Sequence, residues 1–205
     1  MTGRDYDLIL FDIGGVLIEV AGVERMLRWA PYLDTADVMW HQWLTSPVVR
    51  AFESGRTTPQ TFARQMIDEF RLPVSTDRFL EEFRRWPVGL FAGAQALLER
   101  LSATHTLGVL SNTNHIHWEL FETQMTFLDF FRYRFASHLT GHLKPDLESY
   151  HQVAFAAGLE PARILFLDDN QANVDGAREA GLEAYRVYGE AESRARLTAL
   201  GLLQG

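Results

Sequence analysis

The chain has no cysteine, which excludes disulfide bonds, thiolate nucleophiles and cysteine-ligated zinc. Basic residues are in the minority, with 19 Lys and Arg against 27 Asp and Glu, so the formal net charge is −8. Such a chain has no general electrostatic attraction for nucleic acid or for an anionic membrane, and we expect neither as a partner. An anionic substrate would need local cations or a metal ion to bind against this field.

Long apolar runs are also missing. No segment reaches transmembrane length, and the first residues lack a basic flank followed by an apolar stretch, so we expect a cytoplasmic protein. The 205 residues, 47% hydrophobic and 22% charged, are typical of a globular chain of one or two domains. The sequence leaves the oligomeric state open between monomer and homodimer.

Three short apolar runs each end in polar residues: Leu8–Phe11 before Asp12, 106–110 before Ser111 and Asn112, and 163–167 before Asp168 and Asp169. Each run is followed by helix-compatible spacing, which predicts βαβ units in a parallel α/β sheet. Right-handed crossovers bring the carboxyl ends of such strands to one edge of the sheet. We therefore expect these polar residues to converge at a single site.

Residues 20–88 read differently, with helical periodicity and few β-branched runs. The pair Thr58-Pro59 predicts a helix start, because Thr is a good N-cap and Pro suits the first helical position. Further helices are expected over 24–29, 37–44 and 77–86. This stretch predicts a helical insertion between the first strand and the rest of the sheet.

The polar strand ends favour phosphoryl chemistry. A carboxylate such as Asp12 can attack phosphorus, and Asp12, Asp169 and the Gly14 carbonyl are suitable oxygen ligands for Mg²⁺. Lys144 would add a positive charge beside the phosphate. The Ser111 hydroxyl and the Asn112 amide would donate hydrogen bonds to its oxygens.

Each of these residues also has a purely structural interpretation. Asp12 with its glycines could be an ordinary turn, Ser111-Asn112 a helix cap, and Lys144 a solvated loop residue. Asn173 either orients a ligand or caps the next helix. The pair His115 and His117 does not face one direction on a helix, so core or surface roles are favoured over zinc.

The order of FDIGGVL, VLSNTN, Lys144-Pro145 and LFLDDN followed by Asn173 resembles the haloacid dehalogenase (HAD) superfamily. It is most similar to the phosphatases with a helical C1-type cap, and among them to members like α-D-glucose-1-phosphate phosphatase. The resemblance implies a Rossmann-like core formed by 1–18 and 87–205 with a cap at 19–86. The cap turn 52–55 is the candidate for substrate contact.

The resemblance also implies roles for single residues. Asp12 would be the nucleophile and a Mg²⁺ ligand, and Gly14 would offer its carbonyl to the metal. Ser111 and Asn112 would bind phosphate, and Lys144 would balance charge at the catalytic site. Asp169 would be the main acidic metal ligand, with Asp168 in direct or indirect support. The implied reaction is Mg²⁺-dependent hydrolysis of a small phosphomonoester, with a sugar phosphate as one candidate substrate.

One position departs from the pattern of the HAD phosphatases. Most carry a second Asp two residues after the nucleophile, which protonates the leaving group, and here that position is Gly14. Three explanations compete: a substrate with a good leaving group, a proton from Glu19 or from a cap residue, or a weakly active protein used for binding or regulation. A 2-haloacid dehalogenase needs neither this acid nor Mg²⁺, but the acidic pair Asp168-Asp169 argues against that branch.

Overall fold

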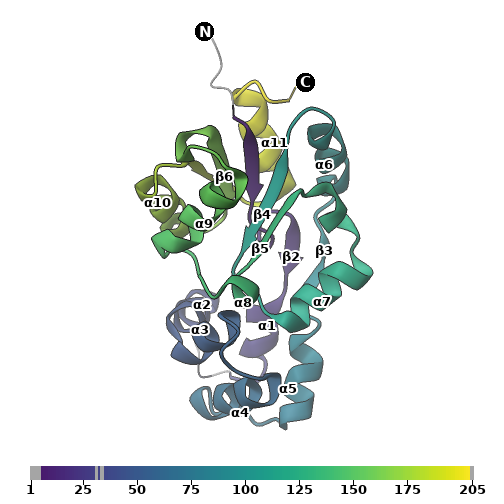
Figure 1. Cartoon of the computed structure of the whole chain (residues 1–205). Helices are drawn as coiled ribbons and strands as arrows, with labels where there is room; N and C mark the ends of the chain where they lie inside the picture. The colour runs from purple at the N-terminus through teal and green to yellow at the C-terminus, as the bar shows by residue number, and fades with distance from the viewer. Residues whose placement is uncertain (1–5, 31, 33–34, 204–205) are drawn as a thin grey trace.

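The computed structural model describes residues 6–30, 32 and 35–203. Its core is a five-stranded parallel sheet in the order β5-β4-β1-β6-β7 (Figure 1). The strands are β1 (Leu8–Phe11), β4 (Leu107–Ser111), β5 (Tyr133–Ala136), β6 (Ile164–Asp168) and β7 (Glu183–Arg186). The predicted parallel α/β, Rossmann-like fold is thus confirmed, and β1 lies at the centre between the other two predicted strands.

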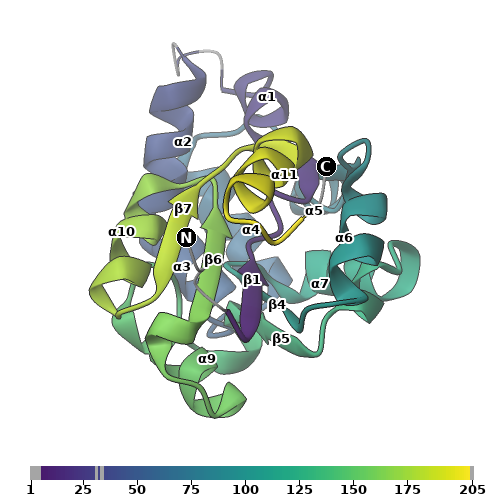
Figure 2. The same ribbon diagram turned by 90° about the horizontal axis from the view of Figure 1, so that it is seen from above.

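Helices cover both faces of the sheet (Figure 2). On one face lie α6 (Ala94–Ser102), α7 (His115–Gln124) and α11 (Gly189–Ala199), and on the other α9 (Leu147–Ala157) and α10 (Gln171–Glu179). Along β1, Ile9 and Phe11 pack toward the first group, and Leu8 and Leu10 toward the second. Because both faces are buried, the strand is apolar at every position instead of alternating.

Short elements complete the sheet's connections: η1 (Phe127–Phe130), α8 (Ser137–Thr140) and η2 (Pro161–Arg163). The expectation that a helix follows each predicted strand is wrong for β1. The chain turns at Gly15, whose φ of 74° suits glycine, and enters β2 (Ile18–Val20). This strand pairs in antiparallel fashion with β3 (Pro87–Leu90).

Between β2 and β3 the described part of the chain forms five helices: α1 (Gly22–Leu27), α2 (Ala36–Thr45), α3 (Pro47–Glu53), α4 (Pro59–Glu69) and α5 (Thr76–Phe83). They pack around an aromatic cluster in which Phe52 stacks on Phe62 at 4.0 Å between ring centroids. The Thr58 hydroxyl accepts a hydrogen bond from the Thr61 amide, as expected of the N-cap of α4. A domain boundary at 19 and 86 remains a prediction, and the β2–β3 pair lies at that position.

Helix α3 was not predicted, and the prediction of a turn over 52–55 is partly wrong. Phe52 and Glu53 are its last two residues, and Phe52 is buried in the aromatic cluster. Helix α3 begins with the same signal as α4. Ser46 precedes a proline, and its hydroxyl accepts hydrogen bonds from the Val48 and Val49 amides. This helix sets the direction of Glu53.

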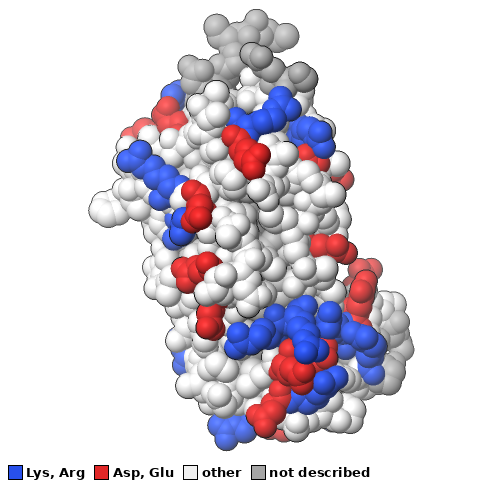
Figure 3. Space-filling view, turned by 90° about the vertical axis from the view of Figure 1, so that its right-hand side faces the viewer, with Lys and Arg blue, Asp and Glu red and all other residues white. Residues whose placement is uncertain are grey.

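The surface in Figure 3 carries arginines and acidic residues side by side over its lower part, where α5 lies. Arg78 and Arg85 pair with Glu81 and Glu82 along this helix, and Arg25 pairs with Glu82 from α1. These arginines are therefore matched by nearby acids. Within the described ranges, the search for a helix both long and apolar enough to cross a bilayer found none.

Candidate active site

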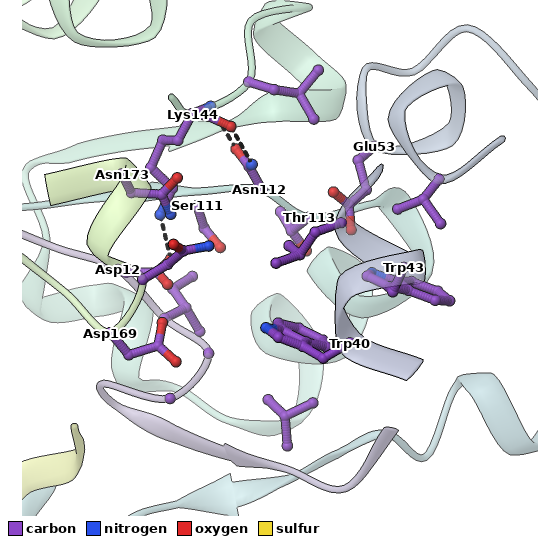
Figure 4. Close-up of a pocket in the computed structure, with 18 of the residues that line it drawn as sticks. Asp12, Trp40, Trp43, Glu53, Ser111, Asn112, Thr113, Lys144, Asp169 and Asn173 are labelled. Atoms are coloured by element: carbon purple, nitrogen blue, oxygen red, sulfur yellow. Dashed lines mark hydrogen bonds and ion pairs between the residues drawn. The ribbon is translucent and has the colours of Figure 1, made fainter. Parts of the chain in front are cut away.

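Polar residues from three adjacent strands meet at the carboxyl edge of the sheet (Figure 4). Asp12 directly follows β1, Ser111 ends β4 and Asp168 ends β6. They line or adjoin a cavity of about 560 Å³ between this edge and helices α2 and α3. The predicted convergence is confirmed, since β1 pairs with both β4 and β6.

A buried lysine joins two of the acids. The Lys144 ammonium lies 2.8 Å from Asp12 Oδ1 and 2.7 Å from Asp168 Oδ2. Burial alone would lower the pKa of Lys144, but the two carboxylates outweigh it and hold that pKa above its usual range. Lys144 is therefore a charged residue of the site, and the interpretation as a solvated loop residue is wrong.

The Asp168 carboxylate is held by hydrogen bonds from several neighbouring residues. Besides Lys144, its carboxylate accepts bonds from the Asn173 amide at 3.0 and 3.1 Å and from the Asn170 backbone amide at 2.8 Å. Its side chain has no exposed surface. These contacts favour indirect support of a metal over direct ligation. They also show that Asn173 orients Asp168, while Asn170 caps α10 by accepting a bond from Ala172.

Burial and neighbouring carboxylates disfavour the ionised forms of Asp12 and Asp169. Burial, reinforced by the charge of Asp168, raises the pKa of Asp12 to about 6 despite the opposing effect of Lys144. Burial and repulsion from Asp12 and Asp168 raise the pKa of Asp169 to about 7. Ligand oxygens of the three acids lie within 4.8 Å of one another. A cation between Asp12 and Asp169 would relieve this repulsion.

The backbone beside Asp12 fits a divalent cation. The Ile13 carbonyl accepts bonds from Leu17 and Ile18, and the Gly15 carbonyl accepts one from Gly189 at 2.7 Å. Among the described residues, no hydrogen bond to the intervening Gly14 carbonyl is found. A Cβ on Gly15 would stand 2.3 Å from Asp169 Oδ2, so glycine is required for this approach. Two carboxylates and a carbonyl form a set of hard oxygen donors suited to Mg²⁺.

The two predicted phosphate ligands differ in what the structure leaves them free to do. No partner of the buried Ser111 hydroxyl is found among the described residues, so it can donate to a ligand. The Asn112 side chain, in contrast, donates to the Lys144 carbonyl and accepts from the Lys144 amide, both at 2.9 Å. This pair of bonds holds the Lys144 loop, and binding of phosphate by Asn112, which lines the cavity, stays a prediction.

The histidine pair has no metal-binding geometry. His117 is buried, its Nε2 lies 2.7 Å from the Phe83 carbonyl, and burial lowers its pKa to about 4. His115 packs against Phe52 at 5.1 Å between ring centroids. Both contacts agree with the core interpretation made from the sequence.

Glu53 is the site residue whose placement the sequence did not give. It lines the cavity on the side opposite Asp12 and Asp169 and points into it, beside Trp40 and Trp43 (Figure 4). Burial, with the charge of Asp12, raises the pKa of Glu53 to about 7 against the effect of Lys144. The other sequence candidate for a proton source, Glu19, is exposed on β2 and does not line the cavity.

The structure is an α/β protein with a parallel sheet, in which an acid after the central strand, a buried lysine and an acid pair at the end of the next strand form one polar site. A family model for haloacid dehalogenase-like hydrolases matches residues 6–181, and the chain belongs to this family. Five described helices lie between β2 and β3, in the part of the chain where the sequence predicts a helical insertion.

Relatives are similar along almost the whole chain. A D-ribitol-5-phosphate phosphatase of Bacteroides thetaiotaomicron is 23% identical over 94% of this chain and 97% of that protein. A sesquiterpene phosphatase of Aspergillus oryzae is 28% identical over 84% of this chain and 85% of its own. A HAD family enzyme of Bacteroides thetaiotaomicron, solved with magnesium and inorganic phosphate, has a TM-score of 0.76 at 25% identity and covers 93% of this chain and 98% of its own.

Proposed function

We propose that this chain is a Mg²⁺-dependent phosphatase that hydrolyses a small phosphomonoester through an aspartyl-phosphate on Asp12. The observation that carries the proposal is the Asp12 carboxylate, held by Lys144 at 2.8 Å and grouped with Asp169 beside the unbonded Gly14 carbonyl. The phosphatase names of the two relatives agree with this chemistry. Their substrates, a polyol phosphate and an isoprenoid phosphate, differ too much to name the substrate here.

The charge balance supports the need for a cation. Asp12, Asp168 and Asp169 carry three negative charges when ionised, and among the described residues Lys144 is the one cation whose side chain pairs with them. A phosphate dianion would meet net negative charge there. Asp12, Asp169 and the Gly14 carbonyl would hold Mg²⁺, which supplies positive charge against the phosphoryl oxygens.

The proposed reaction has two displacement steps, and different residues of the chain act in them. The Asp12 carboxylate attacks phosphorus and forms an aspartyl-phosphate as the alcohol leaves, and water later cleaves that intermediate to regenerate Asp12. Lys144 keeps Asp12 ionised and adjacent to the phosphoryl group, and Ser111 donates to a phosphoryl oxygen. Asp168 and Asn112 hold Lys144 through its ammonium and its backbone.

Glu53 would supply the proton that Gly14 cannot. Its carboxyl group faces the site from α3, and a pKa near 7 suits a group that donates and then accepts a proton at neutral pH. This supports a cap residue as the proton source over Glu19. The resemblance to phosphatases like the α-D-glucose-1-phosphate enzyme rests on the motifs and on Gly14, and the assignment of 19–86 as a C1-type cap rests on the helices and the β2–β3 pair.

The dehalogenase alternative needs no metal, and the acid cluster has no role in it. The binding or regulatory alternative predicts ligand binding without turnover. Phosphate release from acetyl phosphate, p-nitrophenyl phosphate and a panel of alkyl and sugar esters, with Mg²⁺ and with EDTA, tests the proposal. Release that EDTA abolishes supports it. Binding of phosphate esters without release from any of them favours the regulatory alternative.

A further inference from the structure

The cavity has two chemically different walls. The sheet edge contributes Asp12, Ser111, Lys144 and Asp169, which serve the phosphate. The opposite wall is built from apolar side chains of β2, the helical insertion and the segment after β7: Val20, Trp40, Trp43, Leu44, Phe83, Trp86 and Tyr188. Figure 4 shows Trp40 and Trp43 across the cavity from Asp12 and Asp169.

This wall holds an unusual share of the exposed apolar surface. Nine large hydrophobic residues are exposed in the described part of the chain, and four of them line this one cavity: Val20, Trp40, Leu44 and Tyr188. Trp40 is 40% and Leu44 50% exposed, although a fully buried aromatic cluster lies next to them. Apolar surface gathered at one cavity, rather than scattered, marks a ligand-binding site.

The helix α2 presents these residues as a stripe. Trp40, Trp43 and Leu44 lie three and four positions apart, so they share one helical face. Trp43 is fixed from behind by Trp86 at 4.7 Å and Phe83 at 6.0 Å between ring centroids. The wall is therefore a preformed surface whose outer residues, Trp40 and Leu44, remain exposed among the described residues.

The polar groups on this wall are set among apolar carbon. They are the side chains of His41, Thr45, Arg50 and Glu53, the Tyr188 hydroxyl and the tryptophan indole N–H groups, of which that of Trp86 has no hydrogen-bond partner among the described residues. The Thr45 hydroxyl donates within α2 to the His41 carbonyl at 2.8 Å, and Arg50 is paired with Asp146. A polyol bound here would leave most of its hydroxyls against indole and aliphatic carbon, which costs free energy.

The apolar wall also reaches the reacting centre. A Cβ on Gly14 would lie 3.4 Å from a methyl carbon of Val20, so this side chain stands directly over the position beside the nucleophile. The group attached to the ester oxygen would leave the phosphate between Val20 and Glu53 and then pass along Trp40 and Leu44. Its first atoms would then lie against the Val20 methyl groups on one side and the Glu53 carboxyl on the other.

We infer that the substrate is a phosphomonoester of an apolar alcohol, aromatic or branched aliphatic, rather than of a sugar or polyol. The inference rests on the proposed function, because it names the substrate class of that same site. It differs from the sugar phosphate that the family resemblance offered as a candidate. The apolar group would bury the exposed faces of Trp40 and Leu44 as it binds.

The test compares esters of primary alcohols, so that the leaving groups are alike: citronellyl phosphate, which is branched and apolar, and ribitol 5-phosphate, which is a polyol. Acetyl phosphate serves as a small reference that reports the proposed function alone. We expect kcat/KM for citronellyl phosphate to exceed that for ribitol 5-phosphate by at least about tenfold, the least that an apolar pocket contact provides. A preference for ribitol 5-phosphate would overturn the inference and leave the proposed function standing.

Variants locate the effect on the wall. In Trp40→Ala and Leu44→Ala the ratio of kcat/KM for citronellyl phosphate to that for acetyl phosphate should fall about tenfold. Phe155→Ala is the matched control, because Phe155 is 90% exposed on α9 and does not line the cavity, and it should change neither value. An unchanged ratio in both wall variants would show that the wall does not select the substrate.

A binding measurement keeps this inference separate from turnover. Dissociation constants of citronellyl phosphate and ribitol 5-phosphate for the Asp12→Asn protein with Mg²⁺ can be measured by calorimetry even if no ester is hydrolysed. Tighter binding of the apolar ester, weakened in the Asp12→Asn protein that also carries Trp40→Ala, supports the substrate class. Equal binding of the two esters would contradict it.

Discussion

The Lys144 ammonium lies 2.7 Å from Asp168 Oδ2, and neither side chain has more than 1% of its surface exposed. Asp168 has no spare acceptor position facing the cavity once Asn173 and the Asn170 amide are bound. The two adjacent acids of the LFLDDN motif therefore have different tasks. Asp168 fixes a cation of the protein itself, and Asp169 remains available for a bound cation.

The first prediction separates these tasks. Asp168→Asn removes one partner of a buried pair and should lower the free energy of unfolding by on the order of 3 kcal/mol. Asp169→Asn should keep the metal-free fold intact and weaken Mg²⁺ binding by more than the roughly 10–100-fold typical of residues that only support a ligand. Urea denaturation and calorimetric Mg²⁺ titration measure the two effects. The assignment is wrong if Asp168→Asn loses Mg²⁺ while Asp169→Asn retains it.

The second prediction concerns pH and the metal-free protein. The pKa of Asp169 rises from 3.8 to about 7 on folding, so its contribution to stability is fully present below about pH 4 and is lost as the pH rises through 7. Asp169→Asn removes this dependence. In EDTA, the free energy of unfolding of Asp169→Asn minus that of the wild type should increase by roughly 1–3 kcal/mol from pH 5 to pH 8, after allowing for the partial exposure of Asp169.

The comparison with wild type at each pH cancels the effect of His117, whose lowered pKa acts in the opposite direction at acid pH. Added Mg²⁺ should remove most of the difference at pH 8, because it binds the wild-type carboxylates preferentially. A difference that is constant with pH would mean that Asp169 titrates normally in the folded protein.

The third prediction restores the acid that the sequence lacks. A Cβ at Gly14 would meet a Val20 methyl carbon at 3.4 Å, an ordinary van der Waals distance, so the Cβ of Gly14→Asp has room. We expect it to raise kcat for alkyl phosphates toward the ~10²-fold typical of general acid catalysis, with little gain for p-nitrophenyl phosphate, whose leaving group needs no proton.

The neighbouring glycine provides the contrast. Gly15→Ala would place Cβ 2.3 Å from Asp169 Oδ2 at a φ of 74°, and it should lose Mg²⁺ binding. A Gly14→Asp protein that binds Mg²⁺ and phosphate but gains nothing on alkyl esters would indicate that the proton already comes from another residue at full efficiency.

The fourth prediction identifies that residue as Glu53. Glu53→Gln should lower kcat for alkyl phosphates by about 10²-fold and leave kcat for p-nitrophenyl phosphate nearly unchanged. The part of the pH dependence near 7 that is seen with alkyl esters but not with p-nitrophenyl phosphate should disappear, because a pKa of about 7 for Glu53 falls in this range. Glu19→Gln, at an exposed glutamate of β2, is the control and should behave as wild type. An equal loss on both ester types would make Glu53 a substrate-positioning residue.

Much of the site could be predicted because it depends on strand ends. Asp12, Ser111 and Asp169 follow apolar runs, and parallel pairing brings such ends together whatever the details of the loops. The role of Asn112 could not be predicted, since its bonds to the Lys144 backbone join segments 32 residues apart. A sequence pattern gives residue types at an edge, and the choice of partner depends on how two loops pack.

Less of the wall opposite the sheet edge could be predicted from the sequence. Helix α3 could have been found from Ser46-Pro47, the same start signal that predicted α4, and it would have placed Glu53 on a helix. The stripe of Trp40, Trp43 and Leu44 has the spacing of an ordinary core face. Only the packing shows that Trp43 is buried while Trp40 and Leu44 are exposed to the cavity.

If Asp12 is the nucleophile, it becomes phosphorylated during turnover, and chemical trapping can detect the aspartyl-phosphate. Borohydride added during turnover with Mg²⁺ reduces an aspartyl-phosphate to homoserine with release of phosphate, and mass spectrometry of the peptide containing residue 12 detects the change. We expect homoserine at position 12 in the wild type and none in EDTA or in Asp12→Asn, which should also release no phosphate. Continued phosphate release by Asp12→Asn, or reduction at a different carboxylate, would contradict the account.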